Sequence, residues 1–208
     1  REQWREIAEL LTPVTKAWCT DVGMDVTSTA IQVHGGMGFI EETGGVQHLR
    51  DARITTIYEG TTGIQANDLI GRKIAREGGA TITSVIGVMR QVEGELAKQA
   101  GADFAAIHAG FSRGVQALSE AAAYVVTHFS QDVKGVHVGA VPFLRLFGIV
   151  AGGWQLSRAA LIAQAKLAAG GGDEAFLKGK VATARFFADH LLAQAPGLAQ
   201  TVAYGGAG

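Results

Sequence analysis

A carboxylate followed at once by glycine stands out at Glu59 and Gly60, within the stretch from Ile57 to Thr62. A general base must reach the proton that it removes, and a neighbouring glycine lets a substrate approach closely. Thr61 or Thr62 is a candidate cap for a following helix, whose dipole would favour the ionised carboxylate. From these residues alone, a carboxylate that only complements a helix N-terminus is favoured over a catalytic base.

A second candidate is the glycine run Gly35, Gly36 and Gly38, because glycine exposes backbone N–H groups that can bind anions. A dinucleotide fingerprint needs a strand before its glycines and a helix after them. Here we expect a helix before the glycines and an irregular loop after them. The pattern therefore favours a helix cap with a turn over an anion site.

The remaining reactive side chains indicate little chemistry. The histidines lack a second ligand at metal-binding spacing, so we expect no metal site. Cys19 is the single cysteine, which excludes an internal disulfide and favours a reducing, intracellular setting. Beside Trp18 on a helix, it is expected to be a small buried apolar residue. The segment Arg50–Arg53 has two interpretations, a local ion pair or a contact with another subunit or a cofactor phosphate.

The composition is that of a globular helical protein. Hydrophobic residues make up 48% of the 208 positions and prolines number three, which leaves long stretches without a helix breaker. A formal net charge of −1 gives no basic surplus for nucleic acid. The longest apolar run, Val136–Ala151, is interrupted before it reaches the ~20 residues of a bilayer span. We expect a cytoplasmic protein with no membrane span and no nucleic-acid partner.

Hydrophobic periodicity predicts a chain of helices with one boundary. Before Gly78 and Gly79 we expect helices over 2–11, 12–35, 46–52 and 62–76, with an extended segment over 54–58. The helix over 12–35 begins at Thr12-Pro13 and buries the stripe Trp18, Val22, Val26, Ala30 and Val33. After the glycines we expect helices over 81–98, 103–129, 141–169 and 173–194, whose short connections imply an antiparallel bundle. The predicted division is 1–77, then a helical extension over 80–200, then a frayed tail over 201–208.

Three segments follow one another in order: Ala30–Phe39, with its Gln-Val-His-Gly-Gly run, then Leu49–Ile54, then Ile57–Gln65. Together they resemble the C-terminal helical domain of acyl-CoA dehydrogenases far more strongly than any one of them alone. The resemblance implies an all-α fold, in which the helical bundle of that domain is followed by an additional antiparallel helical bundle. The part after Gly79 resembles a longer subgroup, which includes the 3-methylmercaptopropionyl-CoA dehydrogenases.

The resemblance assigns roles to individual positions. Glu59 matches the base that removes the α-proton of an acyl-CoA thioester, while the β-hydrogen leaves as hydride to FAD. Gly60 matches a position that lies against the substrate, and Thr61 and Thr62 match positions that contact FAD. A further set matches a segment that contacts the FAD of a neighbouring subunit, which implies a homodimer or tetramer: Gln32, Val33, His34, Gly35 and Gly36. Met37 and Gly63 depart from the residues common in relatives, which weakens individual FAD contacts.

The activity implied is acyl-CoA dehydrogenation with transfer of electrons to an electron-transfer flavoprotein. Two alternatives stay open: a non-catalytic helical module for oligomerisation or interaction, and an acyl-CoA oxidase that uses dioxygen. Because the chain opens at Arg1, directly into an expected helix, we interpret it as a fragment. The family's N-terminal helical and β domains supply most of the flavin pocket, so the fragment alone is expected to be colourless and inactive.

Overall fold

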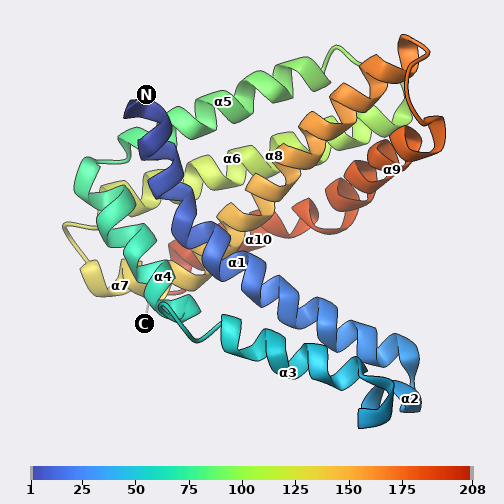
Figure 1. Ribbon diagram of the computed structural model, residues 1–208. Coiled ribbons are helices and arrows are strands. Elements are labelled where there is room, and N and C mark those ends of the chain that lie inside the picture. Colours follow the sequence, from blue (N-terminus) through green and yellow to red (C-terminus); the bar gives the residue numbers. More distant parts are fainter. Residues whose placement is uncertain (1, 207–208) are drawn as a thin grey trace.

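The computed structural model describes residues 2–206, and this part of the chain is all-helical, without a strand. Figure 1 shows a bundle from which two antiparallel helices extend as an arm. The elements in chain order are α1 (Glu2–His34), α2 (Gly36–Phe39), the 3-10 turn η1 (Glu41–Thr43), α3 (Gly45–Thr55), α4 (Thr62–Asp68), the π-helical η2 (Leu69–Ile74), the 3-10 turn η3 (Ala75–Glu77), α5 (Ala80–Leu96), α6 (Ala102–His128), α7 (Val133–Val138), α8 (Ala140–Ala168), α9 (Glu174–His190), the 3-10 turn η4 (Leu192–Gln194) and α10 (Ala195–Tyr204). The predicted all-α fold is confirmed.

α1 is one continuous helix, and the predicted break at Thr12-Pro13 is wrong. The Thr12 hydroxyl donates a hydrogen bond to the Ala8 carbonyl one turn back, at 2.7 Å, instead of capping a new helix. Leu10 and Val14 are buried on either side of the proline. A proline inside a helix costs about 3 kcal/mol, and the packing of this buried face offsets that cost.

The apolar stripe of α1 is buried only in part. Trp18 packs against the core, whereas Val26 is 60% exposed and Val33 is 81% exposed. The second half of α1 lies in the arm (Figure 1), where its neighbours are α2 and α3. The periodicity correctly predicts a helix, but the expected burial of Val26, Ala30 and Val33 is wrong for the described chain.

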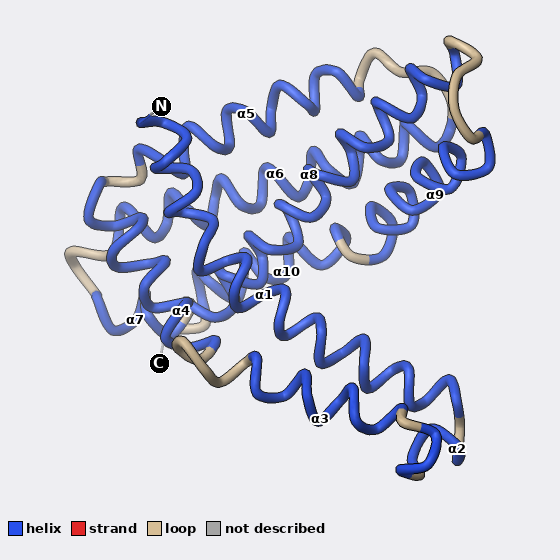
Figure 2. The backbone as a smooth tube through the Cα atoms, in the orientation of Figure 1, coloured by secondary structure: helices blue, strands red, loops and turns tan. Residues whose placement is uncertain are grey.

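Residues 54 and 55 end α3 and residues 56–59 form a turn before α4, so the predicted extended conformation over 54–58 is wrong (Figure 2). The amides of Ile57 and Tyr58 both donate to the Ile54 carbonyl, at 3.0 and 3.1 Å. The Thr56 hydroxyl bonds back to the Arg53 carbonyl at 3.0 Å. Local hydrogen bonds therefore override the preference of these β-branched residues for strands.

The four helices predicted after Gly79 are present as α5, α6, α8 and α9, with ends within a few residues of the predicted ones. Two short helices were not predicted. In α7, Asp132 caps the N-terminus by accepting from the Gly135 amide at 2.9 Å. In α10, Pro196 occupies the first turn, where proline is tolerated. The expected fraying over 201–204 is wrong, because these residues are helical and Val202 is buried; positions 207 and 208 lie outside the described residues.

The buried apolar side chains form one cluster to which both parts of the chain contribute. Leu10 of α1 and Ile70 and Ile74 of η2 belong to the same cluster as Phe111 of α6 and Phe147 of α8. None of the five is more than 1% exposed. Burying such a side chain stabilises the fold by about 1.5–3 kcal/mol. The helices before and after Gly78 and Gly79 therefore share a single core.

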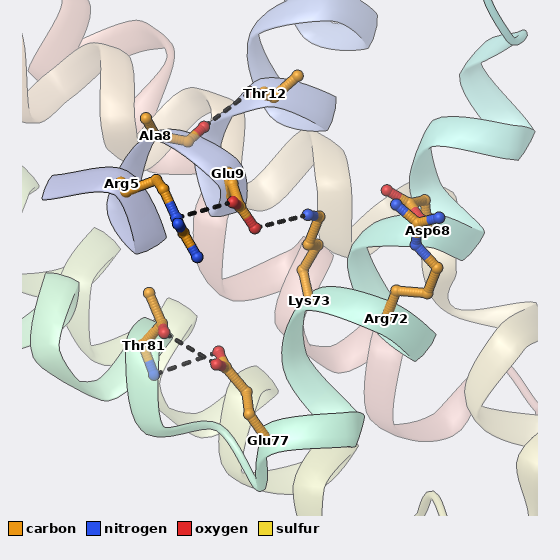
Figure 3. Close-up of polar contacts among 9 residues, drawn as sticks. All are labelled: Arg5, Ala8, Glu9, Thr12, Asp68, Arg72, Lys73, Glu77 and Thr81. Atoms are coloured by element: carbon orange, nitrogen blue, oxygen red, sulfur yellow. Dashed lines mark hydrogen bonds and ion pairs between the residues drawn. The ribbon is translucent and has the colours of Figure 1, made fainter. Parts of the chain in front are cut away.

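A charged surface lies where α1 meets η2 and α5 (Figure 3). The Glu9 carboxylate pairs with Arg5 at 3.5 Å and with Lys73 at 3.4 Å. The Glu77 carboxylate accepts from the hydroxyl and the amide of Thr81, at 3.0 and 3.3 Å, and so satisfies an amide of the first turn of α5. Exposed ion pairs contribute about 0–1 kcal/mol each, so this surface adds little to the stability that the core provides.

Within the described residues, α8 is long and apolar enough to satisfy the length and composition criterion for a membrane span. Half of its most apolar window is buried inside the bundle. Phe143 and Phe147 on this helix are fully buried and pack edge to face, with their ring centres 6.4 Å apart. Burial in the core accounts for its apolar character, since core helices of soluble proteins satisfy the same criterion.

Candidate functional site

Glu59 has an unusual backbone conformation. Its φ is 55°, and it is the single non-glycine residue with positive φ between residues 2 and 206. A left-handed conformation costs a residue with a side chain about 1–3 kcal/mol, and it persists only where the surroundings enforce it. The side chain of Glu59 is exposed. The turn therefore presents an outward carboxylate on a strained but well-defined backbone.

Three hydrogen bonds hold this turn. The Gln65 side-chain amide donates to the Glu59 carbonyl at 2.8 Å, and the Lys16 ammonium donates to the Gly60 carbonyl at 2.6 Å. The Thr62 hydroxyl donates to the Asp21 carboxylate at 2.9 Å. Gln65 belongs to α4, whereas Lys16 and Asp21 belong to α1. Gln65 thus constrains the local shape of the turn, and α1 fixes its position.

Gly60 cannot readily be replaced in this arrangement. Its φ is 93°, a conformation that side chains disfavour. A Cβ atom there would approach Nε2 of Gln65 at 3.0 Å and Cγ2 of Ile64 at 3.2 Å. A larger residue would therefore strain the backbone and push against the side chain that bonds to the Glu59 carbonyl.

The two threonines after Gly60 differ in their contacts. Thr61 occupies the N-cap position of α4, as predicted, but its side chain makes no capping hydrogen bond and the residue is exposed. Thr62 is the first helical residue, and its hydroxyl is engaged with Asp21. Thr61 thus leaves its hydroxyl available at the start of α4, whereas Thr62 contributes to the anchoring of the turn.

Exposed apolar side chains lie within a few residues of Glu59 in the chain. Ile57 is 48% exposed, Tyr58 is 51% exposed and Ile64 is 59% exposed. Ile64 therefore contributes to the surface and not to the core. Water-exposed apolar side chains next to one carboxylate suit a ligand that covers them, such as an acyl chain or a flavin ring. The residues present therefore fit an apolar substrate and an aromatic cofactor.

The second predicted group of FAD contacts lies away from Glu59. Gln32, Val33 and His34 end α1 at the tip of the arm, and Gly35, with φ of 60°, turns the chain into α2 (Figure 1). All five residues from 32 to 36 are exposed. Gln32 lies about three helical turns beyond Asp21, which is roughly 16 Å along the axis. Within one chain, the structure does not bring this group and the Glu59 turn together.

The other candidate residues belong to elements outside the Glu59 turn. Arg50 pairs with Glu41 at 2.6 Å, and not with the adjacent Asp51. Cys19 is exposed, so its predicted burial is wrong; the face of α1 turned to the core carries Ala17. Nδ1 of His137 lies 3.0 Å from the Asn67 side-chain oxygen. Among the described residues, no three histidine, cysteine or acidic side chains gather in a metal-binding cluster.

Sequence reasoning missed the residues that hold the Glu59 turn, which are Lys16, Asp21 and Gln65. A single lysine or aspartate within a long helix carries no motif, because its partner is 41 to 44 positions away in the chain. Asp21 and Thr62 also line a small cleft together with Arg145 of α8, with Leu191 and with Gln194 of η4. The candidate site therefore borders the C-terminal extension.

Comparison with known proteins covers nearly the whole chain. The acetyl-CoA dehydrogenase C-terminal-like family matches residues 86–208, and the acyl-CoA dehydrogenase C-terminal domain family matches residues 3–74. The chain belongs to the acyl-CoA dehydrogenase family. It carries C-terminal regions of such an enzyme, and the three sequence segments all lie within the first of the two matched regions.

Named acyl-CoA dehydrogenases are among its relatives. It is 45% identical to 3-methylmercaptopropionyl-CoA dehydrogenase of Ruegeria pomeroyi over 93% of this chain and 33% of that protein. It is 34% identical to the broad-specificity linear acyl-CoA dehydrogenase FadE5 of Mycobacterium tuberculosis over 90% of this chain and 32% of the relative. A butyryl-CoA dehydrogenase of Syntrophomonas wolfei is 32% identical over 90% of this chain and 31% of its own length. The chain thus spans about a third of the relatives that it matches.

Proposed function

We propose that this chain carries the base of a flavin-dependent acyl-CoA dehydrogenase, with Glu59 removing the α-proton of an acyl-CoA thioester. The observation that supports this most is the strained, outward Glu59 in a turn held by three hydrogen bonds. Strained residues with side chains gather at functional sites.

The chemistry needs this kind of placement. The α-proton of a thioester is only weakly acidic, so a carboxylate must be held within hydrogen-bond reach of it. The oxygen of the thioester carbonyl gains negative charge as the proton leaves, and donors must stabilise that charge. Gly60, which follows the base directly, is the proposed substrate contact, and its positive φ shapes the turn that carries Glu59. The exposed side chains of Ile57 and Ile64 are available to contact the acyl chain.

FAD is the cofactor of this proposal, and when bound it supplies the acceptor for the β-hydrogen. Thr61 and Thr62 follow the base after Gly60 and are the proposed contacts with FAD in the same subunit. Gln32, Val33, His34, Gly35 and Gly36 would contact the FAD of a neighbouring subunit. Gln32 lies roughly 16 Å along α1 beyond Asp21, the partner of Thr62, and this separation supports the division. It requires a homodimer or tetramer.

Two other functions compete with this one. An acyl-CoA oxidase would share the base but reoxidise its flavin with dioxygen, whereas a dehydrogenase would pass its electrons to an electron-transfer flavoprotein. A non-catalytic helical interaction module would use the bundle and need no base. The strain at Glu59 favours an enzyme over the module, because an interaction surface gains nothing from it. We further propose a cytoplasmic location, where acyl-CoA thioesters are available.

The proposal is tested in the complete enzyme by mixing it with acyl-CoA anaerobically and following the loss of the oxidised flavin spectrum. Glu59→Gln keeps the shape of the side chain and removes the base, so reduction should slow by at least about 1,000-fold, near the magnitude of general-base catalysis. Reduction at the wild-type rate would overturn the role of Glu59. A panel of linear, branched and methylthio-acyl-CoA thioesters then defines the substrate. Reoxidation by an electron-transfer flavoprotein or by dioxygen separates dehydrogenase from oxidase.

A further inference from the structure

We propose that Lys16 is a positioning residue that holds the Glu59 carboxylate at its working position by bonding to the next carbonyl along the chain. This inference rests on the proposed role of Glu59 as the base. The Lys16 ammonium lies 2.6 Å from the Gly60 carbonyl oxygen, which is short for a hydrogen bond from nitrogen. A charged donor makes a bond roughly twice as strong as a neutral one.

Lys16 also lies close to the residue that precedes Glu59. The side chain is part-buried, and its ammonium lies 5.7 Å from the centre of the Tyr58 ring, within the range of a cation–π contact. Lys16 thus touches the residues on both sides of Glu59, Tyr58 by its charge and Gly60 by its hydrogen bond. Its contact with the base itself is indirect, through the backbone.

The other two bonds cannot replace it. Gln65 lies on α4, in the same local segment as Glu59, so its bond moves with the turn. Asp21 binds the Thr62 side chain, and a hydroxyl can rotate without moving the backbone. Of the three, the Lys16 bond is the one that ties the backbone beside Glu59 to another element. Without it, the left-handed conformation of Glu59 would lose a constraint that opposes its strain.

α1 gives this bond a further consequence. The same helix that carries Lys16 ends at Gln32, Val33 and His34, the proposed contacts with a neighbouring FAD. α1 is one continuous helix between Lys16 and His34. α1 therefore connects Lys16, which lies beside the proposed base of one active site, to the residues proposed to contact the FAD of a neighbouring active site. A displacement of about 1 Å at a reacting group can lower a rate about 100-fold.

The test compares three variants of the complete enzyme. Lys16→Met keeps the aliphatic stem and removes the donor, and Lys16→Arg keeps a charged donor with a different shape. Lys73→Met is the matched control, because Lys73 is a part-buried lysine bonded at 3.4 Å to Glu9, outside the Glu59 turn. Each variant is assayed for bound flavin, for melting temperature and for the single-turnover rate of flavin reduction per bound flavin.

We expect Lys16→Met to reduce flavin about 100-fold more slowly per bound flavin, with the apparent affinity for acyl-CoA changed less than about threefold. Lys16→Arg should recover part of the rate, and Lys73→Met should match the wild type. Hydrogen–deuterium exchange gives a readout without catalysis: peptides covering residues 57–65 should exchange faster in Lys16→Met only.

Three outcomes would overturn the inference. The first is a wild-type rate per bound flavin in Lys16→Met. The second is a loss of bound flavin with an unchanged rate per bound flavin, which would mean a general structural role. The third is unchanged exchange over residues 57–65. If Lys16→Met does not fold, Lys16→Arg takes its place. A wild-type rate of flavin reduction per bound flavin, with unchanged exchange over residues 57–65, would then overturn the inference. A wild-type rate in Glu59→Gln would instead overturn the proposed function, whatever Lys16 does.

Discussion

The indole of Trp18 on α1 occupies the space that a side chain at Gly148 on α8 would need. A Cβ atom at Gly148 would overlap Cγ and the adjoining atoms of the indole, and one at Gly152, a turn later, would lie 3.0 Å from the far edge of the same ring. The close approach of α1 to the C-terminal extension thus depends on two glycines facing one tryptophan. Since α1 also carries Lys16 and Asp21, this contact supports the helix that holds the Glu59 turn.

Gly148→Ala should therefore destabilise the protein. The methyl group would push Trp18 away from α8, and overpacking of this kind costs about 1–3 kcal/mol. Gly179→Ala is the matched control, because Gly179 lies on an exposed part of α9, where a Cβ atom would have no other atom within 4 Å. It should stabilise α9 by about 0.5–1 kcal/mol. Urea denaturation measures both, and equal stability of the two variants would contradict the assigned contact.

The strain at Glu59 predicts that some inactive variants are more stable than the wild type. Asparagine adopts the left-handed conformation more readily than glutamate does, so Glu59→Asn should raise the free energy of unfolding by up to about 1 kcal/mol. Glu59→Gln keeps the strain and should leave stability nearly unchanged, while both variants lose activity. Thermal melting of the two proteins checks the prediction. A lower melting temperature for Glu59→Asn would show that the left-handed backbone is not under strain.

The lowered pKa of Glu93 should make the stability of the protein depend on pH. Burial acts to raise its pKa, but hydrogen bonds from Ser112 and Arg90, with the charges of Arg90 and His108, outweigh burial and lower the pKa below its ordinary value. The stabilisation is thus complete above the unfolded pKa of about 4.3 and is lost as the pH falls through the lower folded value. Glu93→Gln should lower stability at pH 7 and flatten the loss below about pH 4.3. Glu95→Gln, on the exposed side of the same helix, should do neither.

This chain expressed alone should be colourless and unable to oxidise acyl-CoA. Glu59 and the Gln32–Gly36 group are exposed and lie in different parts of the structure, so one copy offers them no shared pocket. Absorbance between about 350 and 500 nm, where oxidised flavin as the hydride-accepting cofactor absorbs, checks this directly after purification. Stoichiometric yellow flavin in the purified protein would contradict the prediction. The complete enzyme, purified in parallel, serves as the control.

Much of the fold could be predicted from patterns along the chain. Long stretches of helical periodicity predict α5, α6, α8 and α9, because the residues that repeat, such as Phe111 and Phe147, are the ones that pack in the core. Pro13 is a misleading signal, because a proline marks a helix start only if the buried face does not continue past it. The predicted burial of Val33 is wrong for a related reason, since periodicity shows which face is apolar but not what covers it.

The candidate site was predictable only in part. Glu59 and Gly60 are neighbours in the sequence and follow the segments Ala30–Phe39 and Leu49–Ile54. That order singles them out as the candidate base and the glycine beside it. The positive φ of Glu59 could not be foreseen, because glutamate rarely adopts it. The bond from Lys16 depends on how α1 crosses the start of α4, a tertiary relationship that no local pattern records. Sequence thus supplied the proposed base, and the structure shows the residues that hold its turn.

The close fit of Trp18 over Gly148 also constrains how the family can diverge. A bulkier residue at 148 is tolerable only if the residue at 18 shrinks, so substitutions at these two positions should be inherited together. Relatives that lack the extension face no such restriction, and position 18 should vary freely in them. Correlated substitutions at positions 18 and 148 would then indicate that the dehydrogenase segment and its extension have evolved as one folding unit.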